Sequence, residues 1–155
     1  MSNSINRRQI RKWAVQMLFL LDVTHEKDYS KYVKDNSLLN MLYSVELDPE
    51  LEFDLDFDDL PEIDDNNKNY LYEVVQQLEE HKDEVDKLSD SNCKDWDLKR
   101  LQKVDVNIMR LAVIEMLYMD DIPGVVAINE AVELGKIFSD EKSASFINGV
   151  LNSIW

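Results

Sequence analysis

Apolar residues spaced three and four positions apart dominate the last third of this sequence, and this period restricts the fold more than any other feature. After residue 123, apolar residues recur at this three- and four-residue spacing: Val126, Ala127, Ala131, Leu134 and Phe138. Such spacing places side chains on one face of an α-helix. Pro123 suits the first turn of a helix, where its missing N–H costs nothing. The sequence therefore predicts a helix after Pro123 with one buried face.

The same period recurs earlier and predicts about seven helices in all. The other expected helices cover about 5–24, 31–45, 67–89, a short segment around 96–101, 104–119 and a last segment that carries Phe146 and Ile154. Only three glycines and three prolines leave little turn chemistry for an all-β fold. A chain of 155 residues suits one domain with one core, so we expect a single all-α domain.

The segment 104–119 is the most apolar and is expected to be the central helix. Its conspicuous polar residues, Arg110 and Glu115, are interpreted as structural ion-pair or cap residues rather than catalytic ones. Asn148 and Gly149 interrupt the last apolar run. We expect Asn148 to cap or cross-link neighbouring backbone and Gly149 to let two helices approach closely, and a ligand role is the alternative.

Charge is distributed very unevenly along the chain. The net charge is -15, which taken alone argues against binding nucleic acid. Residues 46–65 hold eleven acidic side chains and no basic one, whereas residues 1–21 hold four basic side chains and no acidic one. We interpret residues 46–66 as an extended or disordered acidic connector. Because charges are screened over about 8 Å at physiological salt, the N-terminal end can keep a locally positive field.

The first predicted helix has two different faces. Its expected inward stripe consists of Ile10, Trp13, Ala14, Met17, Leu20 and Leu21. The opposite face is expected to carry Arg7, Arg8, Arg11 and Lys12 on adjacent turns, with Gln16 and Phe19 continuing the same surface. We therefore expect this helix to present an exposed basic face.

No catalytic or metal-binding constellation is found in the sequence. His25 and His81 have no Cys or second His at ligand spacing, and the glycines are scattered singly, so neither an enzyme nor a cofactor is expected. The acids at 54, 56 and 58 match the start of a calcium loop, but the sixth position is Asp59 instead of Gly, and a solvated loop is preferred. A single cysteine and no membrane-span pattern favour a cytoplasmic protein.

Four motifs, in order along the chain, resemble those of the bacterial transcription antitermination factor NusB family. The C-terminal signature is matched by Pro123 to Ala131, which reads PGVVAINEA, and by Phe146 to Leu151, which reads FINGVL. The stretch from Ile108 to Glu115, IMRLAVIE, is similar to a further helix of the family, and Arg11-x-x-Ala14-Val-Gln16 resembles its N-terminal helix. The segment from about 44 to 66 matches no motif of the family.

The resemblance implies a fold of two small packed helical bundles. It also implies a protein that binds the boxA element of nascent ribosomal RNA together with a small-subunit ribosomal protein, NusE, and helps assemble an antitermination complex on RNA polymerase. The alternative is a NusB-like helical module for protein contacts or homodimerisation, with little RNA binding. Loss of salt-dependent RNA binding on replacing the N-terminal arginines would separate the two.

Carried over by position, the resemblance assigns an RNA role to the first helix. Arg7, Arg8 and Arg11 fall on the family's arginine-rich motif and are expected to hold phosphates, with Lys12 on the same face. Gln16 matches the glutamine of that motif. These residue types suit the role, because arginine guanidinium groups grip phosphate and stack on bases.

Four residues outside the arginine motif complete the predicted site. Phe19 stands where relatives often have Tyr, which keeps a stacking surface but removes a hydroxyl donor. Phe146 matches an aromatic beside the family's RNA surface, and Lys142 stands where some relatives carry an acid. Asp105 falls on an acidic position that some relatives use toward the ribosomal-protein partner. Plain core packing remains the alternative for Phe19 and Phe146.

Overall fold

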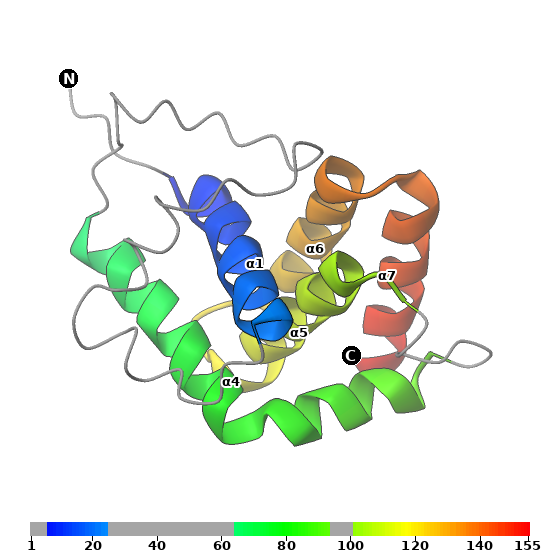
Figure 1. Ribbon diagram of the computed structural model, residues 1–155, viewed down its shortest axis with the longest axis horizontal. Coiled ribbons are helices and arrows are strands. Elements are labelled where there is room, and N and C mark those ends of the chain that lie inside the picture. The colour runs from blue at the N-terminus through cyan, green and yellow to red at the C-terminus, as the bar shows by residue number, and fades with distance from the viewer. Residues whose placement is uncertain (1–5, 25–63, 94–100) are drawn as a thin grey trace.

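The computed structural model describes residues 6–24, 64–93 and 101–155, and every regular element in these ranges is an α-helix. The helices are α1 (Arg7–Val23), α4 (Asp65–Ser91), α5 (Lys103–Tyr118), α6 (Gly124–Phe138) and α7 (Glu141–Ile154) (Figure 1). The all-α prediction is confirmed. The helix expected at 31–45 lies outside the described residues, as do the one around 96–101, except for residue 101, and all but the last residues of the acidic connector.

Three of these helices begin at a residue whose side chain accepts a hydrogen bond from a backbone N–H of the first turn. Asn6 accepts the Gln9 N–H of α1 at 2.9 Å, and the Gln9 side chain accepts the Asn6 N–H in return. Asp64 and Asp140 cap α4 and α7 in the same way. Such caps satisfy orphan donors at a helix start and each contributes about 1 kcal/mol.

Helix α5 is the centre of the described structure, as the sequence predicts. It packs against each of the other four described helices, α1, α4, α6 and α7. Ile108, Met109, Leu111 and Ile114 on α5 are almost completely buried. A helix that is buried nearly all round must be apolar nearly all round, which explains its composition. None of the described helices is long and apolar enough to cross a lipid bilayer.

Close packing of α6 on α7 depends on Gly135 instead of Gly149. A Cβ on Gly135 would lie 3.1 Å from the Cα of Ala144, so this glycine lets the two helices approach. A Cβ on Gly149 would meet no atom of the described residues within 4 Å. Asn148 is exposed, and its side chain accepts a hydrogen bond from Asn152 on the same helix. The expected roles of Asn148 and Gly149 in helix contacts are therefore wrong, because both lie on the outer face of α7.

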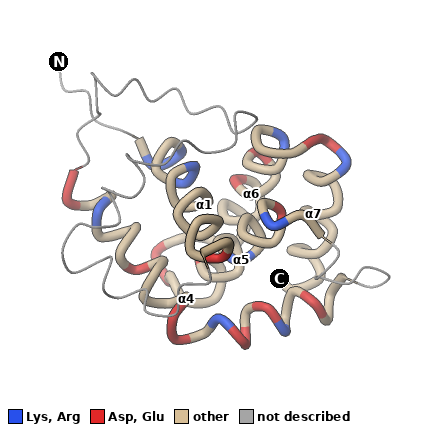
Figure 2. Tube along the Cα trace, viewed as in Figure 1, with Lys and Arg blue, Asp and Glu red and all other residues tan. Residues whose placement is uncertain are grey.

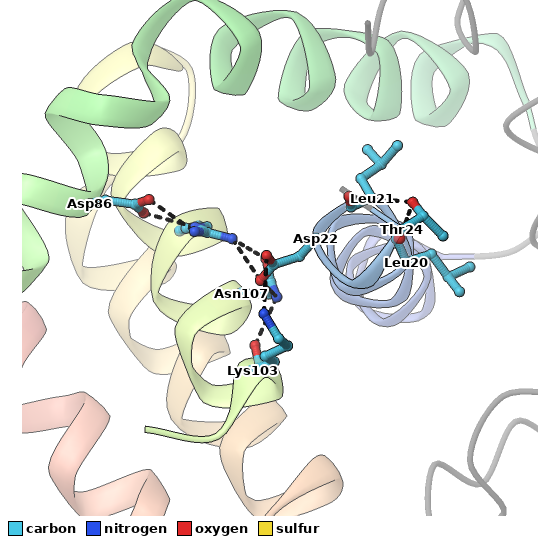
Figure 3. Close-up of polar contacts among 8 residues, drawn as sticks. Leu20, Leu21, Asp22, Thr24, Asp86, Lys103 and Asn107 are labelled. Atoms are coloured by element: carbon cyan, nitrogen blue, oxygen red, sulfur yellow. Dashed lines mark hydrogen bonds and ion pairs between the residues drawn. The ribbon is translucent and has the colours of Figure 1, made fainter. Parts of the chain in front are cut away.

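A buried arginine ties three helices together. Arg110 of α5 donates to Asp86 of α4 at 2.8 and 2.9 Å and to Asp22 of α1 at 3.0 Å. Figure 3 shows Asp22, Asp86 and Asn107 converging between these helices. Burial alone would raise the pKa of Asp22, but Arg110 and Asn107 hold it below its usual value. The predicted structural ion pairs of Arg110 and Glu115 are confirmed, although the two residues pair with different helices.

Candidate RNA-binding face

The basic residues of the candidate site lie on the first turns of α1. The predicted apolar stripe from Ile10 to Leu21 is buried in the core, which turns the N-terminal arginines toward α4, α5 and α6. Figure 2 shows blue segments at this end of α1, while red segments predominate along α4. Each arginine donates its hydrogen bonds to a different helix, although Arg7 and Arg11 both lie over the Tyr70 ring of α4.

Arg7 is held by α4. Its guanidinium lies 4.4 Å above the centre of the Tyr70 ring, and its Nε donates to Oδ1 of Asn67 at 2.9 Å. Planar guanidinium groups stack well on aromatic rings, and such a contact contributes about 0.5–1 kcal/mol at a partly exposed site. Arg7 is thus half-buried but fixed in orientation.

Arg8 is the most exposed arginine of the three and is held by α6. Its Nε and Nη2 donate to the two carboxylate oxygens of Glu130 at 3.2 and 3.1 Å. The Arg8 side chain is 60% exposed, whereas that of Glu130 is 17% exposed. The hydrogen bond and charge of Glu130 raise the pKa of Arg8, which stays cationic. This placement agrees with the expected exposed basic face.

Arg11 does not lie on that face, which corrects the sequence prediction. Only 6% of the residue is exposed, and its Nε and Nη2 donate to Oε1 of Glu115 at 2.9 and 2.8 Å. Burial would lower the pKa of Arg11, but Glu115 raises it. Burial also raises the pKa of Glu115, an effect that Arg11 partly offsets. Because α5 supplies a buried carboxylate directly beneath α1, the third arginine turns inward to neutralise it.

The rest of the predicted α1 face is only partly exposed. Lys12 is half-buried, and Phe19 is half-buried against the core. Gln16 is 2% exposed, which also corrects the prediction of an exposed surface, and its Nε2 has no hydrogen-bond partner among the described residues. The face open to solvent is thus shorter than expected and centres on Arg7 and Arg8.

The remaining predicted residues lie on α5 and α7. Lys142 is exposed on the first turn of α7, and Phe146 is half-buried one turn later. Figure 1 shows α7 on the side of α6 away from α1, so these residues are not beside the arginines. Asp105 is 5% exposed near the start of α5, and its Oδ1 has no partner among the described residues. Burial raises the pKa of Asp105, although the Ser143 and Ser139 hydroxyl groups partly offset this effect.

Sequence reasoning missed the residues that hold the arginines. Asn67, Tyr70 and Glu130 are distant from α1 in sequence, and their contacts appear only when the helices pack. One signal was present for Glu130, because it is an acid that interrupts the apolar run of α6. An acid beside a buried face needs a cationic or hydrogen-bonding partner.

Comparison with known proteins gives matches over almost the whole chain. Residues 8–155 match the family model described as the NusB family. The "Transcription antitermination protein NusB" of Clostridium botulinum (strain Kyoto / Type A2) is 37% identical over 150 residues, which cover 97% of this chain and 99% of the relative. The corresponding protein of Listeria innocua is 40% identical over 116 residues, 75% of this chain and 88% of that protein.

Solved structures show the same fold. NusB of T. maritima superposes with a TM-score of 0.72 at 28% identity and covers 99% of this chain and 92% of its own. A crystal structure of the antitermination factors NusB and NusE in complex with dsRNA matches with a TM-score of 0.70 at 22% identity, over 96% of this chain and 94% of that chain. At that identity the second likeness concerns the fold alone.

Proposed function

We propose a function from the premise that this chain belongs to the NusB family. It is a transcription antitermination factor that binds boxA-type single-stranded RNA in nascent ribosomal RNA. It does so together with the ribosomal protein NusE and helps assemble an antitermination complex on RNA polymerase. Residues 1–155 serve as one RNA-binding domain in the cytoplasm, in a binding role without catalysis.

The observation that supports RNA binding most directly is the pair of oriented arginines at the start of α1. Arg7 and Arg8 are adjacent, cationic and partly exposed, and each is held at its Nε by an acceptor from another helix. Guanidinium groups bind phosphate through paired N–H donors, and fixing them in advance lowers the entropy cost of binding. A locally positive edge of this kind can bind RNA even in a protein of net charge -15.

The other predicted residues take different roles in this proposal. Lys12 extends the phosphate contacts of the arginines by one turn. Half-buried Phe19 and Phe146 offer part of their ring surface for base stacking, and exposed Lys142 adds a cation on α7. Arg11 and Gln16 support the face from beneath instead of touching RNA in the described arrangement.

The NusE contact is proposed around Asp105. Its Oδ1, which has no partner among the described residues, would accept a hydrogen bond from a NusE donor that displaces the neighbouring Ser139 and Ser143. Replacement by Asn would leave the shape unchanged and remove the charge. We expect Asp105→Asn to weaken NusE binding, measured by titration calorimetry, without changing the RNA affinity of the chain alone.

The test of the proposed function is a fluorescence-anisotropy titration of a boxA-type RNA and a scrambled RNA, with and without NusE. The wild-type chain is compared with Arg7→Ala/Arg8→Ala and with Lys87→Ala, which removes one cation from an exposed position of α4. We expect preference for boxA, strengthened by NusE and lost in the double variant only. Each phosphate contact removed should flatten the slope of log affinity against log salt by about 0.7. Equal, weak binding to both RNAs by every variant would contradict the proposal.

A protein adaptor or homodimer is the second candidate function, and exposed apolar side chains favour it. Val125 and Trp155 are 58% and 66% exposed, and the Trp155 ring lies against Gly124, so both apolar side chains are at the start of α6. Sedimentation equilibrium of the wild type and of Val125→Ser measures self-association. Dimerisation that Val125→Ser abolishes, together with no RNA preference, would favour this second function.

A further inference from the structure

We propose that Glu130 is a positioning residue of the RNA face, which holds Arg8 so that only one edge of its guanidinium is offered to phosphate. This inference rests on the proposed function and adds to it a source of selectivity. Glu130 lies on α6, 122 residues after Arg8, and contacts it through both carboxylate oxygens. The pair therefore joins the RNA-binding helix to a different part of the fold.

The contact uses one edge of the guanidinium and leaves the other open. An arginine side chain has five N–H donors. The Nε donor and one Nη2 donor point at Glu130, and no hydrogen bond joins the two donors on Nη1 or the second donor on Nη2 to another described residue. A phosphate can bind this remaining edge without displacing Glu130. A phosphate that approaches the Nε edge meets a carboxylate of like charge.

Glu130 is well placed to act in this way because it is itself constrained. Its side chain is 17% exposed, compared with 45% for Glu133 on the next turn. Helix α6 packs on both α5 and α7, so the carboxylate is anchored to the core rather than to a loop. The charge of Glu130 also reaches Arg11, where it adds to the rise in pKa of that buried guanidinium.

Arg7 is held on the same principle, by a neutral acceptor. Its Nε donates to Asn67 while its face rests on Tyr70. Both partly exposed arginines are thus fixed at Nε by a helix other than α1, and in Arg8 the Nη1 side of the guanidinium is not used by that contact. Two guanidinium groups fixed in this way favour phosphates at one spacing over phosphates in general.

Glu133 supplies a matched control for charge alone. It contributes a Coulombic effect at Arg8 but makes its own ion pair with Lys136. Glu133→Gln removes one negative charge close to the RNA face and leaves the Arg8 contact unchanged. Glu130→Ala removes the same charge together with the contact, and Glu130→Gln keeps an oxygen that can accept from Arg8.

The experiment measures the affinity ratio between boxA-type and scrambled RNA for these variants by fluorescence anisotropy. We expect Glu130→Ala to lower that ratio about three- to tenfold. Without Glu130 the Arg8 side chain must be ordered when RNA binds, and its N–H groups can donate to phosphates that approach from any side. Glu133→Gln should tighten both RNAs slightly and leave the ratio unchanged. Glu130→Gln should recover at least half of the lost selectivity. Thermal unfolding of each variant checks that the fold is intact.

A second measurement tests the positioning without RNA. The Arg8 Nε–H signal in a ¹⁵N NMR spectrum should exchange slowly with solvent in the wild type and in Glu133→Gln, and rapidly in Glu130→Ala. Rapid exchange in the wild type, or an equal change of both RNA affinities in Glu130→Ala, would overturn the proposal. Failure of the proposed function looks different, because the wild type would then show no RNA preference while its Arg8 signal stayed protected.

Discussion

Removing Arg11 should destabilise the protein far more than removing any other arginine of the predicted RNA motif. Its guanidinium is buried and makes hydrogen bonds of 2.8 and 2.9 Å to Glu115, which is itself 1% exposed. Arg11→Met would leave that carboxylate buried without its hydrogen-bonded cation, beside the buried hydroxyl of Tyr70. Breaking a buried pair from one side costs about 3–5 kcal/mol.

That cost is large compared with the total stability of a domain, which is about 5–15 kcal/mol. For a chain of this size it corresponds to a fall in Tm of about 6–20 °C. Replacing both partners, as in Arg11→Met/Glu115→Met, removes the charge together with its need for a partner. We expect the double variant to recover most of the lost stability, because buried pairs can often be exchanged for apolar residues of similar volume.

The assay is thermal unfolding followed by far-UV circular dichroism, combined with RNA titration of the double variant. Arg11→Met should also recover stability as the pH falls, because protonation of Glu115 removes the unpaired charge. If the double variant is no more stable than Arg11→Met, the structural role of the pair is refuted. If it is stable but binds RNA as weakly as an Arg8→Ala variant, Arg11 contacts phosphate after all.

Two further sets of variants test the core and the helix contacts. Asp105→Asn should raise Tm at neutral pH and should raise it less in acid. Burial raises the pKa of this carboxyl in the folded state above its unfolded value, so the carboxyl favours the folded state while it is protonated. That contribution is lost as the pH rises through the folded-state pKa. Asp121→Asn, at an exposed position, is the control, and an equal gain in both variants would contradict this reasoning. Gly149→Ala should stabilise by about 0.5–1 kcal/mol, because an alanine there gains helix propensity and meets open space. Gly135→Ala should destabilise because its Cβ presses on the backbone of Ala144, and denaturant unfolding that reverses the order of the two glycine variants would contradict the packing argument.

The fold was predictable from sequence wherever one side of a helix had to be apolar. The period of the apolar residues predicts the helix after Pro123, and the high apolar content of residues 104–119 predicts the central helix around Ile108. Val126, assigned to a buried face, is in fact exposed, since the stripe of α6 is narrower than its apolar content suggests.

The site was harder to predict, because the exposure of a charged residue depends on distant partners. Arg8 and Arg11 differ by three positions and look alike in the sequence, yet one is open and the other buried. The difference arises from Glu130 and Glu115, which α6 and α5 bring to α1 only in the folded chain. The spacing of residues within α1 does not indicate which of the two arginines is buried.

The dependence of α1 on partners from later in the chain has a consequence for protein synthesis. Arg11 and Glu115 are 104 residues apart, and Arg8 and Glu130 are 122 apart. At translation rates of about 5–20 residues per second, Glu115 is made about 5 to 20 s after Arg11. During that interval the apolar stripe of α1 has no α5 to pack on and is a target for chaperones. Synonymous codons that slow the ribosome between α1 and α5 should therefore lower the yield of active protein, whereas equal slowing before α1 should not.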